Sequence, residues 1–237
     1  MLLFYVRHGD PIYSPNSLTP LGLRQAEAVA KRLSRYGLDE IYVSSSNRAI
    51  LTSKPTCEIL KKEAVILDWC NEDYAWNEFV VDFDGGRTWL FSHDETAKKL
   101  VSNEIFALGE NWAEHSMFDG KNVRSGIERV RRETYGFLAG QGYVFNPEKN
   151  MYKCENHNEK RIALFAHQGF GLVFLSTVLR IPYPIFSTHF DMSHTGVTVI
   201  EFDDNDGYCI PKILQLSNDS HLYAEGLPTK YHNSIYF

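Results

Sequence analysis

Short apolar runs that stop abruptly at polar residues are the feature that most constrains the fold of this chain. The run LLFYV at residues 2–6 ends at Arg7 and His8, and the run IALFA at residues 162–166 ends at His167. Each run is short and apolar at every position, which is typical of strands covered on both faces. The two runs therefore predict buried strands of a parallel sheet.

Helical patterns separate the predicted strands. Thr19 is a suitable N-cap and Pro20 suits the first helical position, so a helix is expected over residues 19–36. A second helix is expected over residues 48–62, kinked or delayed by Pro55. Strands and helices alternate at both ends of the chain. We therefore expect an α/β fold with a mainly parallel sheet and helices on both of its faces.

The middle of the chain lacks this regularity. Ten aromatic residues fall within residues 69–118, and helical periodicity is weak over residues 64–120. A clear helical pattern returns only at residues 122–140. We expect a single domain over residues 1–237, in which residues 64–158 form an aromatic-rich, helical, cap-like insertion.

The C-terminal part contains two more strand patterns. Residues 196–203 and 208–217 are each expected to form one strand, and the stretch NDSHL around His221 is expected to be a turn. A polar connection with a short hairpin is expected over residues 140–160.

Composition excludes several classes of function. The formal net charge is −6, so a nucleic-acid partner is not expected. The apolar stretch at residues 162–179 contains His167 and Gln168 in its first half, which favours a strand, turn and helix over a membrane span. The cysteines form no CxxC pair, which favours reduced thiols and a cytoplasmic location. The four are Cys57, Cys70, Cys154 and Cys209.

Basic side chains follow the predicted strands at their carboxyl ends. Arg7 and His8 follow the first strand. Arg48 begins the helix after a second short strand, expected at EIYVSS in residues 40–45, and His167 follows a later strand. Ligands of open α/β sheets bind at this edge, where arginine forks and helix N-termini suit phosphate oxygens. We expect a phosphoryl site there. We expect no metal, because an arginine-rich centre repels cations.

Four motifs resemble the histidine phosphatase superfamily, which includes the cofactor-dependent phosphoglycerate mutases. They occur in the expected order and cover about half of the chain. The motifs are RHG at 7–9, LTPLGLRQAEAVAKRL at 18–33, SSSNRAILTS at 44–53 and FAHQGF at 165–170. The resemblance implies a phosphoglycerate mutase-like fold and catalysis without a cofactor.

The resemblance also implies roles for individual residues. His8 would attack phosphorus and carry the phosphoryl group as phosphohistidine. Arg7, Arg48 and His167 would bind the phosphoryl oxygens, and His167 would also take part in catalysis by offsetting the developing charge.

A carboxyl group would protonate the leaving group. The family carries this glutamate after the second helix, and Glu72 in the sequence ILDWCNEDYAW matches that context. Asp68 and Glu78 remain alternatives.

Departures from the mutases favour a phosphatase. The mutases carry RHGxSxWN after the first strand, whereas this chain has RHGDPIYSPN, with Ser14 where the asparagine would fall. No counterpart of the mutases' substrate clamp occurs in residues 90–130. We expect hydrolysis of a small-molecule phosphoester. A phosphoglycerate mutase-type phosphotransferase and a non-catalytic phospho-ligand binding module are the alternatives.

Overall fold

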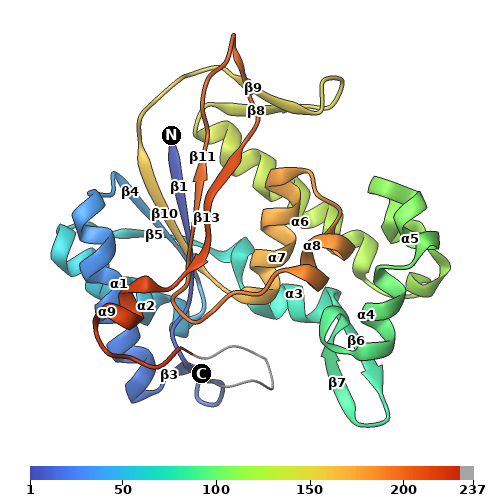
Figure 1. Ribbon diagram of the computed structural model, residues 1–237, viewed down its shortest axis with the longest axis horizontal. Coiled ribbons are helices and arrows are strands. Elements are labelled where there is room, and N and C mark those ends of the chain that lie inside the picture. The colour runs from blue at the N-terminus through green and yellow to red at the C-terminus, as the bar shows by residue number, and fades with distance from the viewer. Residues whose placement is uncertain (230–237) are drawn as a thin grey trace. The chain divides into compact units, whose positions relative to one another are not determined.

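The computed structural model describes residues 1–229, which form two compact units. The first unit comprises residues 1–71 and 157–168 and the described residues from 191 onward, and the second comprises residues 72–156 and 169–190 (Figure 1). The predicted insertion, residues 64–158, overlaps the longer segment of the second unit.

A six-stranded sheet is the centre of the first unit (Figure 1). Its strands lie in the order β13-β11-β1-β10-β4-β5. In that order they comprise Lys212–Asn218, Val197–Glu201, Leu2–Arg7, Arg161–Ala166, Glu40–Ser44 and Ala64–Leu67. Strands β1, β10, β4 and β5 pair in parallel, whereas β11 pairs antiparallel with both β1 and β13. The predicted α/β class with a mainly parallel sheet is confirmed.

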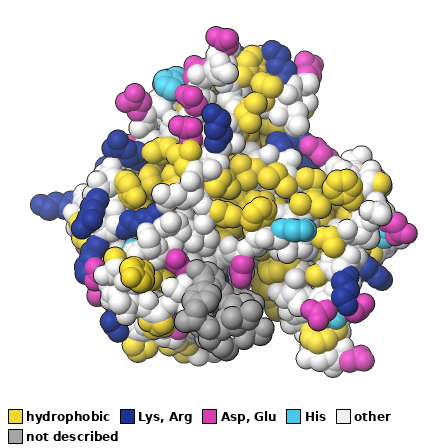
Figure 2. All heavy atoms as spheres, viewed as in Figure 1, with side chains coloured by type: hydrophobic (Ala, Val, Ile, Leu, Met, Phe, Trp, Pro, Cys, Tyr) yellow, Lys and Arg dark blue, Asp and Glu magenta, His cyan; other side chains and the backbone are white. Residues whose placement is uncertain are grey.

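Helices α1 (Pro20–Tyr36) and α2 (Asn47–Leu60) cover one face of this sheet. The Thr19 side chain caps α1 by accepting a hydrogen bond from Gly22 N at 3.0 Å. Pro55 lies inside α2 and does not delay its start, contrary to one of the two effects expected. Side chains from both helices and from alternate strand positions share one core. Its members include Phe4, Val6, Val29, Leu33, Val43, Ala49 and Phe165. Figure 2 shows several Lys and Arg side chains over the part of the surface where Figure 1 draws α1.

The smaller elements of the first unit correct two sequence-based predictions. They are β2 (Pro11–Ile12), β3 (Ser17–Leu18), a 3-10 helix (Asp68–Cys70), β12 (Tyr208–Cys209) and α9 (Ser220–Ala224). The strand expected over residues 208–217 is interrupted between β12 and β13 at Ile210 and Pro211, because proline has no N–H for a sheet ladder. His221 lies in the short helix α9, so the predicted turn was wrong.

The second unit consists mainly of short elements. They are α3 (Glu72–Glu78), β6 (Val80–Phe83), β7 (Gly86–Trp89), α4 (Asp94–Leu100), α5 (Asn103–Leu108), α6 (Val123–Gly140), β8 (Tyr143–Asn146), β9 (Met151–Cys154), α7 (Gln168–Leu179, from Gly169 onward) and α8 (Tyr183–His189), with 3-10 helices at Leu90–Ser92, Gly109–Glu114 and Ser116–Phe118. The elements between residues 72 and 108 have at most seven residues each, which is too few to show a clear hydrophobic periodicity in the sequence. The pair β8–β9 is the hairpin expected in the polar connection.

Aromatic side chains build much of the second unit's interior. Trp112 is 2% exposed, and its ring stacks on that of Tyr183 at a centroid distance of 5.4 Å. Phe118 meets the same indole edge-on at 5.3 Å, and Phe79 lies 5.2 Å from Tyr183. These rings are core residues of the second unit.

The apolar stretch at residues 162–179 forms strand β10, a turn and helix α7, as predicted. Within residues 1–229, no helix combines the length and the apolar character needed to cross a membrane.

Candidate active site

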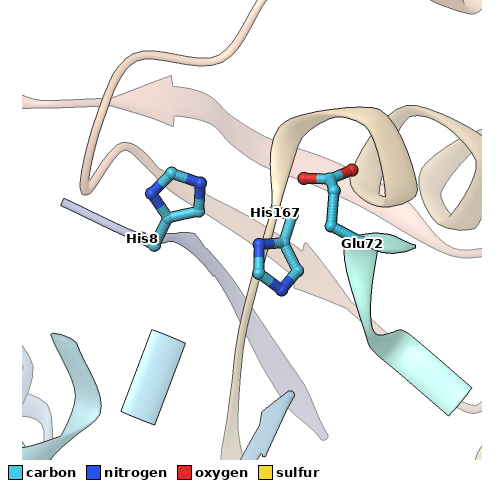
Figure 3. A group of neighbouring side chains, drawn as sticks. All are labelled: His8, Glu72 and His167. Atoms are coloured by element: carbon cyan, nitrogen blue, oxygen red, sulfur yellow. The ribbon is translucent and has the colours of Figure 1, made fainter. Parts of the chain in front are cut away.

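The parallel pairing of β1 with β10 brings two histidines to the same edge of the sheet. Arg7 pairs with Ala166, so His8 and His167 follow at equivalent positions, and His8 N donates to Ala166 O at 2.9 Å. Their ring centroids lie 5.2 Å apart (Figure 3). The carboxyl-end site predicted from the sequence therefore places both imidazoles side by side.

The turn after His8 fixes the orientation of its ring. Nδ1 of His8 lies 2.7 Å from the carbonyl oxygen of Gly9, and Gly9 N donates to Thr52 Oγ1 at 3.0 Å. A Cβ atom at position 9 would lie 2.6 Å from Gly22 O, so the close approach of this turn to α1 requires glycine. Since a carbonyl oxygen only accepts, the ring hydrogen is on Nδ1 and the lone pair is on Nε2.

Two buried arginines lie in the same unit. Arg7 is 4% exposed and donates through Nη1 to the carbonyl oxygen of Met192. Arg48, near the start of α2, is 5% exposed, and its guanidinium lies over the Tyr13 ring. Within residues 1–229, the buried Nε of Arg48 makes no hydrogen bond. A buried cationic group with an unsatisfied hydrogen-bond donor favours an anionic ligand.

His167 is held by neighbouring strands. Its Nε2 lies 2.8 Å from the Ser44 hydroxyl at the end of β4, and its backbone carbonyl accepts from the Tyr5 hydroxyl at 2.6 Å. Because Ser44 engages Nε2, Nδ1 is the ring nitrogen that could bind a phosphoryl oxygen. Ser44 is an addition to the predicted site, and its place as the first residue of the motif SSSNRAILTS was the signal of it.

The electrostatic environment keeps both imidazoles neutral. Burial, then the charges of His167, Arg7 and Arg48, lower the pKa of His8 well below its ordinary value of 6.5. Burial, then Arg48 and Arg7, lower the pKa of His167 well below the same value. A neutral His8 with a lone pair on Nε2 is ready to act as a nucleophile without a separate base.

Sequence reasoning missed a carboxylate–histidine pair next to His8. The His194 ring lies 5.8 Å from that of His8, and its Nδ1 is 3.5 Å from Asp10 Oδ1. Asp10 is fixed in turn by Thr19, whose hydroxyl donates to Oδ2 at 2.7 Å. Asp10 follows RHG directly, which was a usable signal, whereas His194 could be found only from the antiparallel pairing of β11 with β1.

Asn16 is a further missed residue. Its side chain donates to Ser46 Oγ at 2.9 Å and accepts from Arg48 N at 3.1 Å. The sequence directed attention to Ser14, but Asn16 is the residue that joins the loop after β1 to the start of α2.

The candidate proton donors lie in different surroundings. Glu72 is the first residue of the second unit, where its Oε1 accepts from Phe170 N at 2.8 Å near the start of α7. Figure 3 labels Glu72 at the start of α3, with His8 and His167 at the ends of their strands. Glu78 forms a two-pronged ion pair with Arg129, both contacts at 2.6 Å. Asp68 accepts from the Ser45 hydroxyl at 2.6 Å.

A family model supports the interpretation of this edge of the sheet. The model of the histidine phosphatase superfamily (branch 1) matches residues 3–103, a segment that contains Arg7, His8, Arg48 and Glu72. Residues 3–103, somewhat less than half of the chain, therefore resemble this superfamily. The predicted resemblance is confirmed by this match, which ends before His167. No curated protein sequence matches the chain significantly.

Solved structures of several phosphatases share the fold. A phosphoserine phosphatase variant from Entamoeba histolytica, in complex with phosphoserine, is 19% identical, with a TM-score of 0.59 and coverage of 93% of this chain and 98% of its own. A mycobacterial glucosyl-3-phosphoglycerate phosphatase is 17% identical, with a TM-score of 0.58 and coverage of 91% and 97%. The alpha-ribazole phosphatase from Shigella flexneri is also 17% identical, with a TM-score of 0.58 and coverage of 92% and 97%. At these identities the likeness establishes the fold.

Proposed function

We propose that the protein is a phosphomonoesterase that hydrolyses a small organic phosphate through a phosphohistidine intermediate on His8. The observation that carries this proposal is the 2.7 Å contact between His8 Nδ1 and the Gly9 carbonyl oxygen, which leaves Nε2 as the nucleophile. Around it, Arg7, Arg48 and His167 are buried donors suited to phosphoryl oxygens.

The proposed reaction has two displacements. In the first, the Nε2 lone pair of His8 forms a bond to phosphorus while the bond from phosphorus to the ester oxygen breaks. In the second, water attacks phosphorus, the P–N bond breaks, and inorganic phosphate leaves with His8 neutral again. Arg7, Arg48 and His167 bind the phosphoryl oxygens in both steps and stabilise the charge that develops on them. No step requires a metal ion or another cofactor.

Glu72 is our candidate for the proton donor to the leaving oxygen. Asn71, joined to it by a peptide bond, donates to the Ser45 hydroxyl at 2.9 Å, next to the Ser44 that holds His167. Within the second unit, Glu72 Oε1 binds Phe170 N, three residues after His167 in the chain. The two alternative proton donors are engaged elsewhere. Glu78 forms an ion pair with Arg129, and Asp68 accepts a hydrogen bond from Ser45.

The substrate class follows from the same features and from the similar structures. Proteins of this fold include phosphatases for phosphoserine, glucosyl-3-phosphoglycerate and alpha-ribazole, all small organic molecules. We place the selection of the organic part in the aromatic-rich segment predicted as a cap, residues 64–158. A cytoplasmic location, without nucleic-acid or membrane partners, remains part of the proposal.

Release of inorganic phosphate from a panel of phosphoesters tests this function. The panel contains phosphoserine, 3-phosphoglycerate and p-nitrophenyl phosphate, each assayed with and without a chelator. The proposal requires release that the chelator does not diminish and that His8→Ala abolishes. Activity only with added divalent metal, or isomerisation of phosphoglycerate without release, would contradict it.

A further inference from the structure

A groove on the surface of the first unit lies apart from the residues of the candidate active site. It is formed by α1, the end of β13 and α9, and we call it the α1–α9 groove. Its volume is about 330 Å³, within the range of roughly 300 to 1,000 Å³ that suits small organic ligands. The residues that define it chemically are Lys31, Arg32, Arg35, Tyr36, Asn218 and His221.

The groove is positively charged. Lys31, Arg32 and Arg35 line it, against the single carboxylate of Glu225. Burial, then the charge of Arg32, lower the pKa of His221 to about 4, so this imidazole is neutral at physiological pH. Cations therefore exceed anions in the groove, which favours an anionic ligand.

Two of the cations are available to a ligand. The Arg35 side chain is exposed and makes no hydrogen bond or ion pair with the part of the chain that the structure describes. Lys31 pairs with Glu225 at 2.6 Å, but both side chains are exposed, 58% and 38%, so the pair contributes little and an anion can compete for Lys31. Tyr36 adds a half-exposed ring, packed on Phe4 at 5.3 Å, as an apolar wall.

Arg32, which also lines the groove, is hydrogen-bonded to neighbouring residues, and we call it the floor of the groove. Its Nη1 donates to the backbone and side-chain oxygens of Asn218 at 2.8 and 2.7 Å, and its Nη2 donates to Gln215 Oε1 at 2.6 Å. This network fixes β13 and α9 against α1, so the groove is preformed.

The floor is hydrogen-bonded to the turn that carries His8. Arg32 Nη1 lies 3.4 Å from His221 Nδ1, and His221 Nε2 lies 3.0 Å from Thr195 Oγ1. The Thr195 hydroxyl donates to His194 O at 2.7 Å, so it accepts from Nε2–H of the neutral imidazole. Thr195 N in turn donates to the carbonyl oxygens of Arg7 and His8 at 3.1 and 3.3 Å.

We propose that the α1–α9 groove binds a small organic anion with an apolar part, and that His221 and Thr195 couple its occupancy to the turn that carries His8. The anionic group contacts Arg35 and Lys31, and the apolar part packs on Tyr36. Binding itself is independent of the proposed function, whereas the coupling rests on it.

Calorimetric titration with benzoate and, separately, with phenylphosphonate tests the binding. Arg48→Ala protein is used, because it lacks one donor of the candidate phosphate site. We expect one site per chain, and binding at least about tenfold weaker when Lys31 and Arg35 are both changed to Glu, a loss of about 1.4 kcal/mol. If one probe binds more tightly than the other, the site is supported, and the difference shows whether it prefers a carboxylate or a phosphonate.

Arg24→Glu is the matched control, since Arg24 is an exposed arginine of α1 outside the groove. It should leave the dissociation constants unchanged. Absence of binding by both probes, or an equal loss in Arg24→Glu, would overturn the binding site.

Product inhibition tests the coupling. The inhibition constant of inorganic phosphate is measured in the wild-type enzyme with and without saturating benzoate, and we expect a change of about fivefold or more. The change should vanish in the Lys31→Glu, Arg35→Glu variant. An unchanged constant would overturn the coupling. Absence of any hydrolysis would contradict the proposed function instead, and the calorimetric result would stand.

Discussion

Nδ1 of His8 donates a hydrogen bond to the carbonyl oxygen of the next residue, Gly9, at 2.7 Å. A ring held through Nδ1 presents Nε2 with its lone pair, provided that the imidazole is neutral. Burial and the surrounding cationic side chains favour that neutral form by lowering the pKa of His8. In the proposed mechanism, the nucleophile is therefore activated by its position rather than by a partner base.

The protonation state of His8 can be observed directly. We expect the ring resonances of His8 to stay at neutral-form shifts when pH falls from about 8 to about 6, since its pKa lies well below the ordinary 6.5. Carbon-detected NMR of histidine-labelled protein, assigned with His8→Asn and referenced to free imidazole, provides the measurement. A midpoint near that of free imidazole would show that His8 is not desolvated as described.

Arg48→Ala should greatly reduce catalysis. The buried guanidinium is suited to the charge that develops on the phosphoryl oxygens, and removing one such donor costs about 10²–10³-fold in rate. Arg48→Lys keeps the charge but loses the planar fork, so we expect a partial loss. Values of kcat/KM on one substrate compare these variants with Arg24→Ala, which should match the wild type. Near-normal kcat/KM in Arg48→Ala would remove this arginine from the site.

Glu72→Gln should have an effect that depends on the leaving group. An alkyl alkoxide needs a proton to leave, and general acid catalysis contributes roughly 10²–10⁴-fold. An aryl oxide with an acidic phenol needs it much less. Rates on an alkyl phosphate should therefore fall by about that range, while those on p-nitrophenyl phosphate fall far less.

Glu78→Gln and Asp68→Asn are the matched controls for this effect. Each should lower stability, since Glu78 pairs with Arg129 and Asp68 binds Ser45, but neither should show selectivity for the alkyl substrate. Equal losses on both substrate types in Glu72→Gln would assign Glu72 a structural role. Selective loss in one of the controls would move the assignment to that carboxylate.

Acid should weaken the fold through His221. Its pKa is about 4 in the folded protein, against 6.5 for the ordinary side chain, so the unfolded chain binds a proton first as pH falls. The stability that depends on the neutral form is complete above about pH 6.5 and is lost toward pH 4, by about 3 kcal/mol at most. Buried His8 and His167 act in the same direction.

Urea unfolding at about pH 7 and pH 4 measures this loss in the wild type and in His221→Gln. We expect the free energy of unfolding to decrease less with acid in the variant, because it has no imidazole to protonate at this position. An identical pH dependence in both proteins would show that His221 does not contribute.

The sequence predicted the parts of the site that depend on local order along the chain. Arg7, His8 and His167 follow apolar runs directly, and parallel pairing places the ends of such runs at one edge. Arg48 could be placed because a cation at a helix start is electrostatically unfavourable without an anion. His194 could not, because its approach to His8 depends on the antiparallel pairing of β11 with β1, which no local pattern reveals.

The second unit was the least predictable part for a related reason. Its elements between residues 72 and 108 are too short for hydrophobic periodicity, and their order depends on contacts between distant aromatic rings such as Trp112 and Tyr183. In the first unit, the apolar pattern of residues 208–217 predicted one continuous strand, but the structure has two strands there, separated at Pro211.

Trapping of the phosphoenzyme tests the central claim most directly. The protein is mixed briefly with a ³²P-labelled phosphodonor, quenched, and divided between acid and alkali, with His8→Ala and His194→Ala treated in parallel. We predict a label that is stable in alkali, labile in acid, absent from His8→Ala and present in His194→Ala. A label that survives acid, or that His8→Ala retains, would contradict a phosphohistidine mechanism on His8.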